Sequence, residues 1–192
     1  MSKLTDKGRG IRDMFDKIAP RYDLLNRVLS LGIDKRWRRF AVRQLAVPKG
    51  GMVLDIATGT GDVALEIGRQ TDPDVKIVGS DFTQGMLVLG RDKIDASPYR
   101  DRIVLVNAPC EAMPHPDGIF DGITIAFGIR NVVDRQKGLC EMVRVLKPGG
   151  RAVILEFATP RNSFFRSVYH FYFLKVLPWL GGLISQRSAY QY

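Results

Sequence analysis

The chain has 192 residues, of which 45% are hydrophobic, so it is long enough to bury a sizeable core as one compact domain. Its two cysteines, Cys110 and Cys140, have neither metal-ligand spacing nor a disulfide framework around them, which argues against a metal site and against a disulfide-stapled secreted domain. Residues 1–18 are polar and charged, so we expect no signal peptide and a cytoplasmic protein with reduced thiols.

Residues 10–47 predict two or three short helices around Pro20. One of them covers residues 35–45, along which a stripe at helical spacing contains Trp37, Phe40, Ala41, Gln44 and Leu45. Arginines occupy its other faces at Arg36, Arg39 and Arg43. This pattern fits a helix packed on the core with a solvated basic face, and it fits equally an interfacial helix on a membrane.

Positive charge is concentrated at the start of the chain. Residues 1–49 carry eight of the nine net positive charges, and residues 50–192 are close to neutral. A basic segment of this kind can face nucleic acid or an anionic membrane surface, and the charge alone does not choose between them.

The glycine-rich stretch Val53–Gly61 carries the strongest functional signal. Apolar residues lead into Asp55 and then into the turn Gly59-Thr60-Gly61, which is how a buried parallel strand ends and feeds a helix. Glycine lets the backbone approach a ligand and adopt dihedrals that a Cβ disfavours. Asp81 ends the next apolar strand, where its carboxylate could accept hydrogen bonds from both hydroxyls of a ribose.

Two cofactors fit this pattern. Residues 59–64 also satisfy the dinucleotide fingerprint, but a pyrophosphate has little use for a carboxylate such as Asp55 beside it. S-adenosylmethionine carries an ammonium and a sulfonium, which Asp55 would favour. The purely structural alternative is a strand-turn-helix connection that binds no ligand and in which Asp62 caps the helix. We therefore predict an S-adenosylmethionine site.

Strand and helix patterns alternate along the rest of the chain. Strands are predicted at 52–57, 76–81, 103–107, 121–126 and 151–157, and helices at about 62–70, 83–95 and 134–146. The run Leu146–Gly150 reads as a helix stop and a turn before the last strand. The predicted fold class is therefore α/β, a doubly wound and mostly parallel sheet that binds its ligand at the carboxyl ends of the strands.

Residues 164–184 form an apolar, aromatic run, but its charged residues and proline argue against a transmembrane helix. Stripes at helical spacing leave it apolar over more than half its circumference. It could pack on the sheet, form a lid over a very apolar substrate, or dip into lipid.

Four separated runs now give a family resemblance. They are Tyr22–Ser30 with Trp37, Val53–Gly61, Phe120–Asn131 and Met142–Gly150. In this order they resemble the ubiquinone/menaquinone biosynthesis C-methyltransferases over nearly the whole chain, and the run Gly128–Asn131 separates that family from other class I methyltransferases.

The resemblance implies a Rossmann-like S-adenosylmethionine-binding domain at 50–160. It also implies a basic helical appendage at 1–49 and an apolar lid or membrane-facing helix at 161–192. The expected reaction is C-methylation of a polyprenylated hydroquinone, either demethylmenaquinol or its ubiquinone-pathway counterpart, at the cytoplasmic face of a membrane. An anionic membrane surface is the expected partner, through residues 1–49 and 164–184. We expect no nucleic acid, and homo-oligomers are possible.

Cofactor contacts are expected from Phe82 and from the loop at Pro109 and Cys110, in addition to the glycine turn and the two acids. The family usually has a side-chain acceptor for the adenine amine where this chain has Pro109, so the backbone N–H of Cys110 is left to serve the ring. The sequence also ends at Tyr192, before the final hairpin that the family pattern includes.

Arg130 and Asn131 are the predicted catalytic pair. A hydroquinone carbon becomes nucleophilic when the neighbouring hydroxyl loses its proton, and a fixed cation stabilises the phenolate. Arginine is a poor base, so we expect the pair to hold the phenolate and to orient a water that accepts the proton. The alternative for Arg130 is an ion pair with Asp134 at a helix start.

Weaker candidates remain open. His115 and His170 could each relay protons, although a lone histidine is more often structural. An S-adenosylmethionine-dependent methyltransferase for RNA or another small molecule would share the fold and the cofactor, and RNA would explain the basic start of the chain. A non-catalytic cofactor-binding module would need neither Arg130 nor an apolar pocket.

Overall fold

The structure is a computed structural model, and it describes residues 6–30 and 32–158. The predictions for the third part of the chain, residues 161–192, lie outside the described residues. They include the apolar segment 164–184 and His170.

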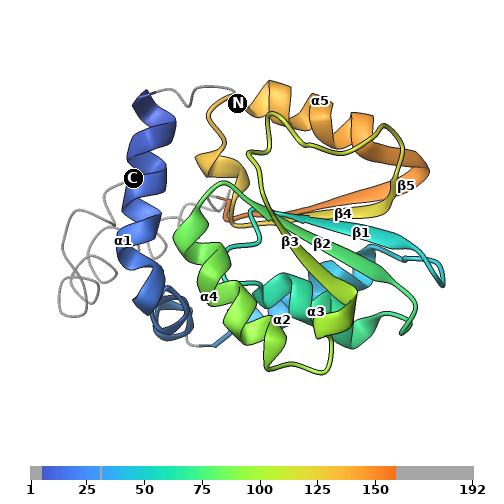
Figure 1. Cartoon of the computed structure of the whole chain (residues 1–192), viewed down its shortest axis with the longest axis horizontal. Coiled ribbons are helices and arrows are strands. Elements are labelled where there is room, and N and C mark those ends of the chain that lie inside the picture. Colours follow the sequence, from blue (N-terminus) through green and yellow to red (C-terminus); the bar gives the residue numbers. More distant parts are fainter. Residues whose placement is uncertain (1–5, 31, 159–192) are drawn as a thin grey trace, which may run out of the picture.

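A five-stranded parallel sheet forms the centre of the molecule (Figure 1). Its strands are β1 (Met52–Ile56), β2 (Lys76–Asp81), β3 (Ile103–Asn107), β4 (Phe120–Ala126) and β5 (Leu146–Leu155). They lie in the order β3-β2-β1-β4-β5, and every neighbouring pair is parallel. The order reverses beside β1, which pairs with β2 on one side and with β4 on the other. The predicted doubly wound α/β fold is confirmed.

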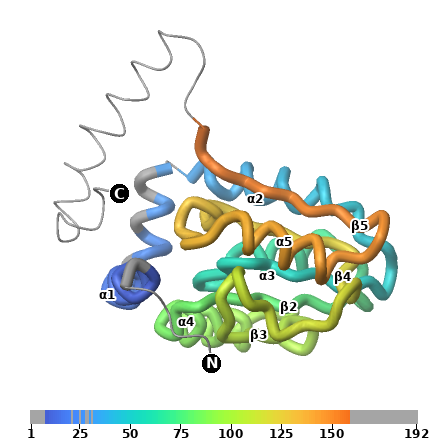
Figure 2. The backbone as a smooth tube through the Cα atoms, turned by 90° about the horizontal axis from the view of Figure 1, so that it is seen from above, coloured from blue at the N-terminus to red at the C-terminus, as the bar shows by residue number. Residues whose placement is uncertain are grey.

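Helices surround this sheet, and all of the described ones except the first cover its two faces. They are α1 (Asp6–Leu29), α2 (Asp34–Gln44), α3 (Asp62–Gln70), α4 (Gln84–Asp95) and α5 (Arg135–Val145), with short 3-10 turns at Arg100–Arg102 and Ile129–Asn131. Figure 1 shows α2, α3 and α4 below the sheet and α5 above it. Figure 2 shows α1 across one end of the sheet, away from both layers.

Alternation along the strands divides the core into two clusters. Val53 of β1 packs with Val63 of α3 and Ile94 of α4 on one face. Leu54 points to the other face, where it packs with Met142 of α5. A strand that is buried on both faces explains why β1 reads as a continuous apolar run broken only by Asp55.

The N-terminal prediction was wrong at Pro20. One helix, α1, runs through this proline instead of breaking there. Proline removes one backbone hydrogen bond, but Pro20 is exposed and the side chains beyond it anchor the helix to the glycine loop and α4. Tertiary contacts therefore override the local signal.

The predicted stripe on α2 was partly wrong. Ala41, Val42 and Leu45 are buried against the core, whereas Phe40 is 63% exposed. The helix instead turns Arg38 inward, where this cation pairs with two carboxylates. Charge pairing therefore sets the rotation of the helix.

Both predicted limits of the last strand, 151 and 157, were too late in the sequence. β5 begins at Leu146, which pairs with Phe120, and the register then shifts so that Arg151 pairs with Gly122. The run Lys147–Gly150 is therefore an irregularity inside the strand instead of a turn before it. A proline and two glycines are typical of such bulges.

Candidate functional site

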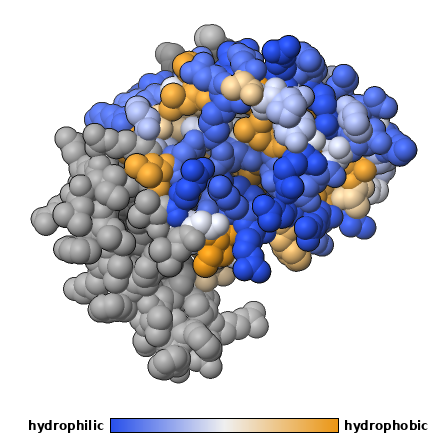
Figure 3. Space-filling view, turned by 90° about the horizontal axis from the view of Figure 1, so that it is seen from below, coloured by the Kyte–Doolittle hydropathy of each residue, from blue (hydrophilic) through white to orange (hydrophobic). Residues whose placement is uncertain are grey.

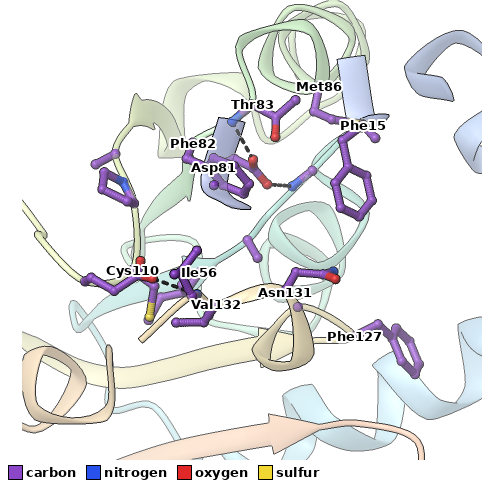
Figure 4. Close-up of a pocket in the computed structure, with 18 of the residues that line it drawn as sticks. Phe15, Ile56, Asp81, Phe82, Thr83, Met86, Cys110, Phe127, Asn131 and Val132 are labelled. Carbon is purple, nitrogen blue, oxygen red and sulfur yellow. Dashed lines mark hydrogen bonds between the residues drawn. The ribbon is translucent and has the colours of Figure 1, made fainter. Parts of the chain in front are cut away.

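A pocket opens at the carboxyl ends of β1, β2, β3 and β4, beside α1 (Figure 4). The residues that line it come from α1 and from the loops that follow the strands: Gly8, Phe15, Tyr22, Ile56, Ala57, Gly59, Asp81, Phe82, Thr83, Met86, Ala108, Pro109, Cys110, Glu111, Ala126, Phe127, Gly128, Asn131, Val132 and Val133. Parallel α/β sheets bind ligands at this edge, where the strand order reverses. The position agrees with the prediction from sequence.

The two glycines of the turn after β1 serve different purposes. Gly59 lines the pocket with φ +56°, and a Cβ added there would lie 3.9 Å from the Tyr22 ring. Gly61 is the N-cap of α3 at φ +80°, and its Cβ would lie 3.2 Å from Ile94 of α4. Gly59 therefore exposes backbone to a ligand, whereas Gly61 allows close helix packing and is not among the described lining residues.

Asp81, at the end of β2, is buried in the pocket wall. One oxygen accepts the N–H of Gly59 at 2.9 Å and the other accepts the N–H of Thr83 at 2.8 Å, as the dashed lines in Figure 4 show. Burial raises the pKa of Asp81, and the two N–H donors oppose this rise. Each carboxylate oxygen keeps a second lone pair, so Asp81 can still accept ribose hydroxyls.

Asp55 lies outside the described pocket lining, which differs from the expectation that it faces the ligand. It is 1% exposed, and its two oxygens accept the hydroxyls of Thr58 at 2.6 Å and Thr124 at 2.7 Å. Burial raises its pKa to about 6 against the effect of these hydrogen bonds. Asp55 therefore ties the turn after β1 to β4 from within the sheet, and its role toward a ligand stays a prediction.

Thr60 also differs from its prediction as a ligand contact. Its side chain is buried away from the described lining and donates to Asp23 of α1 at 2.6 Å. The side chain thus joins the glycine turn to the first helix.

The loop after β3 forms a second wall. Pro109 and Cys110 line the pocket, as does Phe82 from the loop after β2. Glu111 accepts the N–H of Val133 at 2.9 Å, which fixes this loop to the one before α5. Burial raises the pKa of the Cys110 thiol to about 12, with the nearby acids adding to it, so the thiol stays neutral.

Arg130 and Asn131 separate in the structure. Asn131 lines the pocket, but Arg130 is not among the described lining residues and its side chain is 50% exposed. The guanidinium lies 3.3 Å from Glu156 and 5.6 Å from the centre of the Phe157 ring. The alternative pairing with Asp134 was wrong, because the partner of Arg130 is Glu156. Asp134 instead caps α5 by accepting the N–H of Lys137.

Three aromatic rings gather where β4 and β5 end. Phe127 stacks on Phe157 with ring centres 4.8 Å apart, and Trp37 of α2 packs against both. Phe127 has φ +57°, which is costly for a side chain of this size. Strained residues cluster at ligand sites, and Phe127 lines this pocket.

Tyr22 is a pocket residue that the sequence reasoning did not single out. Burial raises its pKa, against the effects of a hydrogen bond with Asn26 and of nearby arginines, so its hydroxyl stays protonated at neutral pH. The signal was present in the run Tyr22–Ser30, which contributed to the family resemblance. No periodicity shows that α1 crosses the ends of the strands.

His115 lies outside the described pocket lining, packed edge-on against Phe120 with ring centres 5.1 Å apart. Burial lowers its pKa, and the charge of Arg144 adds to this effect. Within residues 6–30 and 32–158, no group of three or more His, Cys, Asp or Glu side chains is arranged to hold a metal ion.

Glycine backbone beside a buried acceptor, with apolar walls on either side, fits an adenosyl group better than a pyrophosphate. This fold and pocket define a class I methyltransferase that uses S-adenosylmethionine. The family model described as the ubiE/COQ5 methyltransferase family matches residues 1–192, and the chain belongs to that family.

Related proteins and structures agree with this assignment. The ubiquinone/menaquinone biosynthesis C-methyltransferase UbiE of Geobacter sulfurreducens is 66% identical, across 100% of this chain and 75% of its own length. The demethylmenaquinone methyltransferase of Deinococcus radiodurans is 50% identical, across 97% of this chain and 77% of its own length.

Solved structures share the fold. An S-adenosylmethionine-dependent methyltransferase from Aquifex aeolicus matches with a TM-score of 0.59 and 21% identity, across 66% of each chain. The [4+2]-cyclase SpnF matches with a TM-score of 0.70 and 20% identity, across 81% of this chain and 62% of its own. Because a cyclase shares this fold, the fold alone does not define the reaction.

Proposed function

We propose that this chain transfers a methyl group from S-adenosylmethionine to a ring carbon of a polyprenylated hydroquinone, demethylmenaquinol or its ubiquinone-pathway counterpart. One observation carries the proposal. The pocket that contains Gly59 and Asp81 also contains Asn131, from the run Gly128–Asn131 that is typical of the family. The names of its relatives in Geobacter sulfurreducens and Deinococcus radiodurans support the same reaction.

The cofactor end of the pocket is assigned to Asp81, Gly59, Phe82 and the loop at Pro109 and Cys110. Asp81 would accept the ribose hydroxyls, and the apolar walls would enclose the adenine ring. When bound, S-adenosylmethionine supplies an electrophilic methyl group, so the protein has mainly to align the reactants and exclude water. Alignment of this kind contributes about 7–11 kcal/mol in well-oriented systems.

The substrate end is assigned to Asn131 and to the hydroxyl of Tyr22. The ring of Tyr22 also lies beside Gly59 at the cofactor end, where it closes that part of the pocket. Because the Tyr22 hydroxyl stays protonated, it can donate to a hydroquinone oxygen as negative charge develops there. Arg130 directly precedes Asn131 in the chain and adds a positive charge near the pocket, which Glu156 partly balances. We assign it to stabilising the phenolate electrostatically and not to accepting the proton.

The apolar side of the pocket suits a prenyl chain. Phe15 and Met86 line it near α1 and α4, and Phe127 lines it at the end of β4. The stacked rings of Phe127 and Phe157 extend this wall toward Trp37. A substrate with a long hydrocarbon tail would bury its apolar surface there, at about 25 cal/mol for each Å² removed from water.

We also propose that the protein attaches peripherally to anionic membranes, because its substrate stays in the bilayer. None of the helices in the described part of the chain is both long and apolar enough to cross a membrane. Along α2 and the residue before it, Ile33, Arg36, Phe40 and Arg43 recur at helical spacing on an exposed face. Arg38, another arginine of α2, is buried in ion pairs and is not part of this surface.

Methyl transfer from labelled cofactor tests the proposed reaction, with demethylmenaquinol, the ubiquinone-pathway quinol and RNA each offered as acceptor. We expect label in a quinol and none in RNA, and the preferred quinol identifies the ring. Label in RNA alone would replace this proposal with the nucleic-acid alternative. Cofactor binding without transfer to any acceptor would favour a non-catalytic module.

Substitutions test the assigned roles. Asn131→Ala should lower kcat by about 10²–10³-fold, because its contact matters mainly in the transition state. Arg130→Ala should lower kcat by a smaller factor, since its charge is half-exposed and partly balanced by Glu156. Both variants should leave the Kd of the cofactor nearly unchanged. Lys137→Ala, an exposed cation on α5, is the matched control and should behave as wild type. Equal losses of cofactor binding and turnover would assign both residues a structural role instead.

A further inference from the structure

Lys93 of α4 joins three other parts of the molecule that lie far apart in the sequence. Its ammonium donates to Asp23 of α1 at 2.8 Å and to Thr60 of the glycine turn at 3.1 Å. It also donates to Asp62, the first residue of α3. The Lys93 side chain is 31% exposed, so water screens these contacts only in part.

Asp23 closes a triangle with the same partners. Its other oxygen accepts the Thr60 hydroxyl at 2.6 Å, so Asp23, Thr60 and Lys93 each contact the other two. Removing one of these three side chains therefore takes a hydrogen-bond partner from each of the other two, so the three act as one unit.

A second cation completes the charge balance around this triangle. Arg38 of α2 lies 3.0 Å from Asp34 and also pairs with Asp62. Burial alone would raise the pKa of Asp62, but the charges of Arg38 and Lys93 outweigh it and lower the pKa. Asp62 therefore stays ionised and keeps both cations in place.

The triangle lies directly behind two residues of the pocket. Asp23 follows Tyr22 on α1, and Thr60 follows Gly59 in the glycine turn. Tyr22 and Gly59 both line the pocket, and a Cβ on Gly59 would lie 3.9 Å from the Tyr22 ring. Thr60, Asp23 and Lys93 are not among the described residues that line it, so any effect they have on a ligand passes through these neighbours.

We propose that Asp23 and Lys93 are positioning residues that hold α1 against the glycine turn, so that Tyr22 closes the cofactor pocket. The half of α1 before Pro20 has a separate attachment, because Asp16 accepts the N–H of Gly85 at the start of α4 at 2.9 Å. Loss of the triangle therefore loosens the half of α1 that carries Tyr22 and leaves the helix attached to the molecule.

The test compares Asp23→Asn, Lys93→Met and the double variant, using calorimetric titration with S-adenosylmethionine and amide exchange across residues 6–29. Each single variant should raise the Kd about tenfold, and the double variant should raise it no further, because the two side chains act as one unit. Amides of α1 should exchange faster while those of β1 and β4 keep their protection.

Two controls make the outcome decisive. Asp13→Asn removes an acid from the same helix whose partner is Arg12, at 3.3 Å, and should leave the Kd unchanged. Lys93→Arg keeps the charge and should recover part of the affinity. These measurements use the cofactor and no quinol, so their outcome does not depend on the proposed methyl-transfer reaction.

An unchanged Kd in folded Asp23→Asn and Lys93→Met would overturn the proposal, as would additive effects in the double variant. A lower melting temperature with a normal Kd would also overturn it, since that is the signature of a merely structural pair.

Discussion

Asp55 and Asp81 lie at the ends of neighbouring strands, yet their surroundings give them different tasks. Both are buried, and burial raises the pKa of each. Asp81 faces the pocket and accepts backbone N–H groups, whereas Asp55 is enclosed by two threonine hydroxyls. Sequence spacing alone assigned both acids to the ligand, because spacing does not show which face of a strand end is open.

Asp81→Asn should weaken binding of S-adenosylmethionine by about 1–3 kcal/mol, because an amide is a poorer acceptor for ribose hydroxyls and one of its groups must face a backbone N–H. Calorimetric titration measures this change. Asp121→Asn removes an acid that pairs with Lys147 at the opposite edge of the sheet and is the matched control. Equal affinity in wild type and a folded Asp81→Asn would remove Asp81 from the site.

Asp55 should make stability depend on pH. Its folded pKa of about 6 exceeds the ordinary value of 3.8 for an aspartate, so the native state binds this proton more tightly than the unfolded state. The resulting stability is present at low pH and is lost as the pH rises through about 6. The free energy of unfolding should therefore gain about 1 kcal/mol from this group between pH 7 and pH 5.

Asp55→Asn cannot titrate at this position, so the difference in unfolding free energy between wild type and the variant isolates the contribution. Urea denaturation at several pH values supplies it. A difference that stays flat across this range, or that favours wild type at higher pH, would contradict the assigned pKa.

At the scale of elements, α1 shows how contacts override local preference. Pro20 lies inside this helix, where it has no N–H to donate to the carbonyl four residues earlier. Asp16 and Asp23, on either side of it, make the contacts with α4 and with the glycine turn. Side-chain anchors therefore stabilise a helix that its own backbone bonds support less well.

Pro20→Ala should stabilise the protein by about 1–3 kcal/mol, since alanine restores the missing N–H and is the best helix former. The melting temperature in thermal denaturation is the measurement. Pro73→Ala, in the exposed loop before β2, is the control and should bring no such gain. A lower melting temperature for Pro20→Ala would show that the helix needs the proline ring.

Most of the sheet could be predicted from the sequence, because most of its strands are short apolar runs with glycine, proline or acidic residues close to their ends. β2 and β3 have the predicted limits, and β1 differs by one residue at its end. The misplaced start of β5 came from Lys147–Gly150, where proline and glycines describe a bulge as well as they describe a turn.

The positions of site residues were predictable where these residues lie at or just after the end of a strand. They were unpredictable where the side-chain position depends on a partner in another element. Gly59, Asp81 and Asn131 follow β1, β2 and β4, so their meeting follows from the topology. The inward rotation of Arg38 and the turning away of Arg130 both depend on partners in other elements, Asp62 and Glu156. No local pattern reports such pairings.

At the scale of the whole molecule, the surface bears on where the protein works. Figure 3 shows that the face carrying α2, α3 and α4 is mostly hydrophilic, with apolar residues in small separate groups. Such a surface offers single apolar anchors and no broad hydrophobic patch. Attachment to lipid would then depend mainly on charge.

Sedimentation with vesicles that contain anionic lipid tests the proposed attachment through α2. Replacing Lys35, Arg36 and Arg43 by Gln should weaken binding about a hundredfold at low salt, at about 1 kcal/mol for each cation. Wild-type binding should weaken in high salt, and Phe40→Ser should weaken the part that salt does not remove. Replacing Arg135 and Lys137 on α5, across the sheet, is the control and should change little. No binding of wild type at low salt would refute the attachment.

The attachment of α1 to α4 also sets the order in which the protein can be completed during synthesis. Asp16 and Asp23 leave the ribosome early, but their partners Gly85 and Lys93 follow 69 and 70 residues later. The first helix must therefore wait for its docking site while translation continues. Asn131 is added later still, so the pocket needs residues from both early and late parts of the chain. A nascent protein therefore acquires its binding site only after most of the sheet has been made.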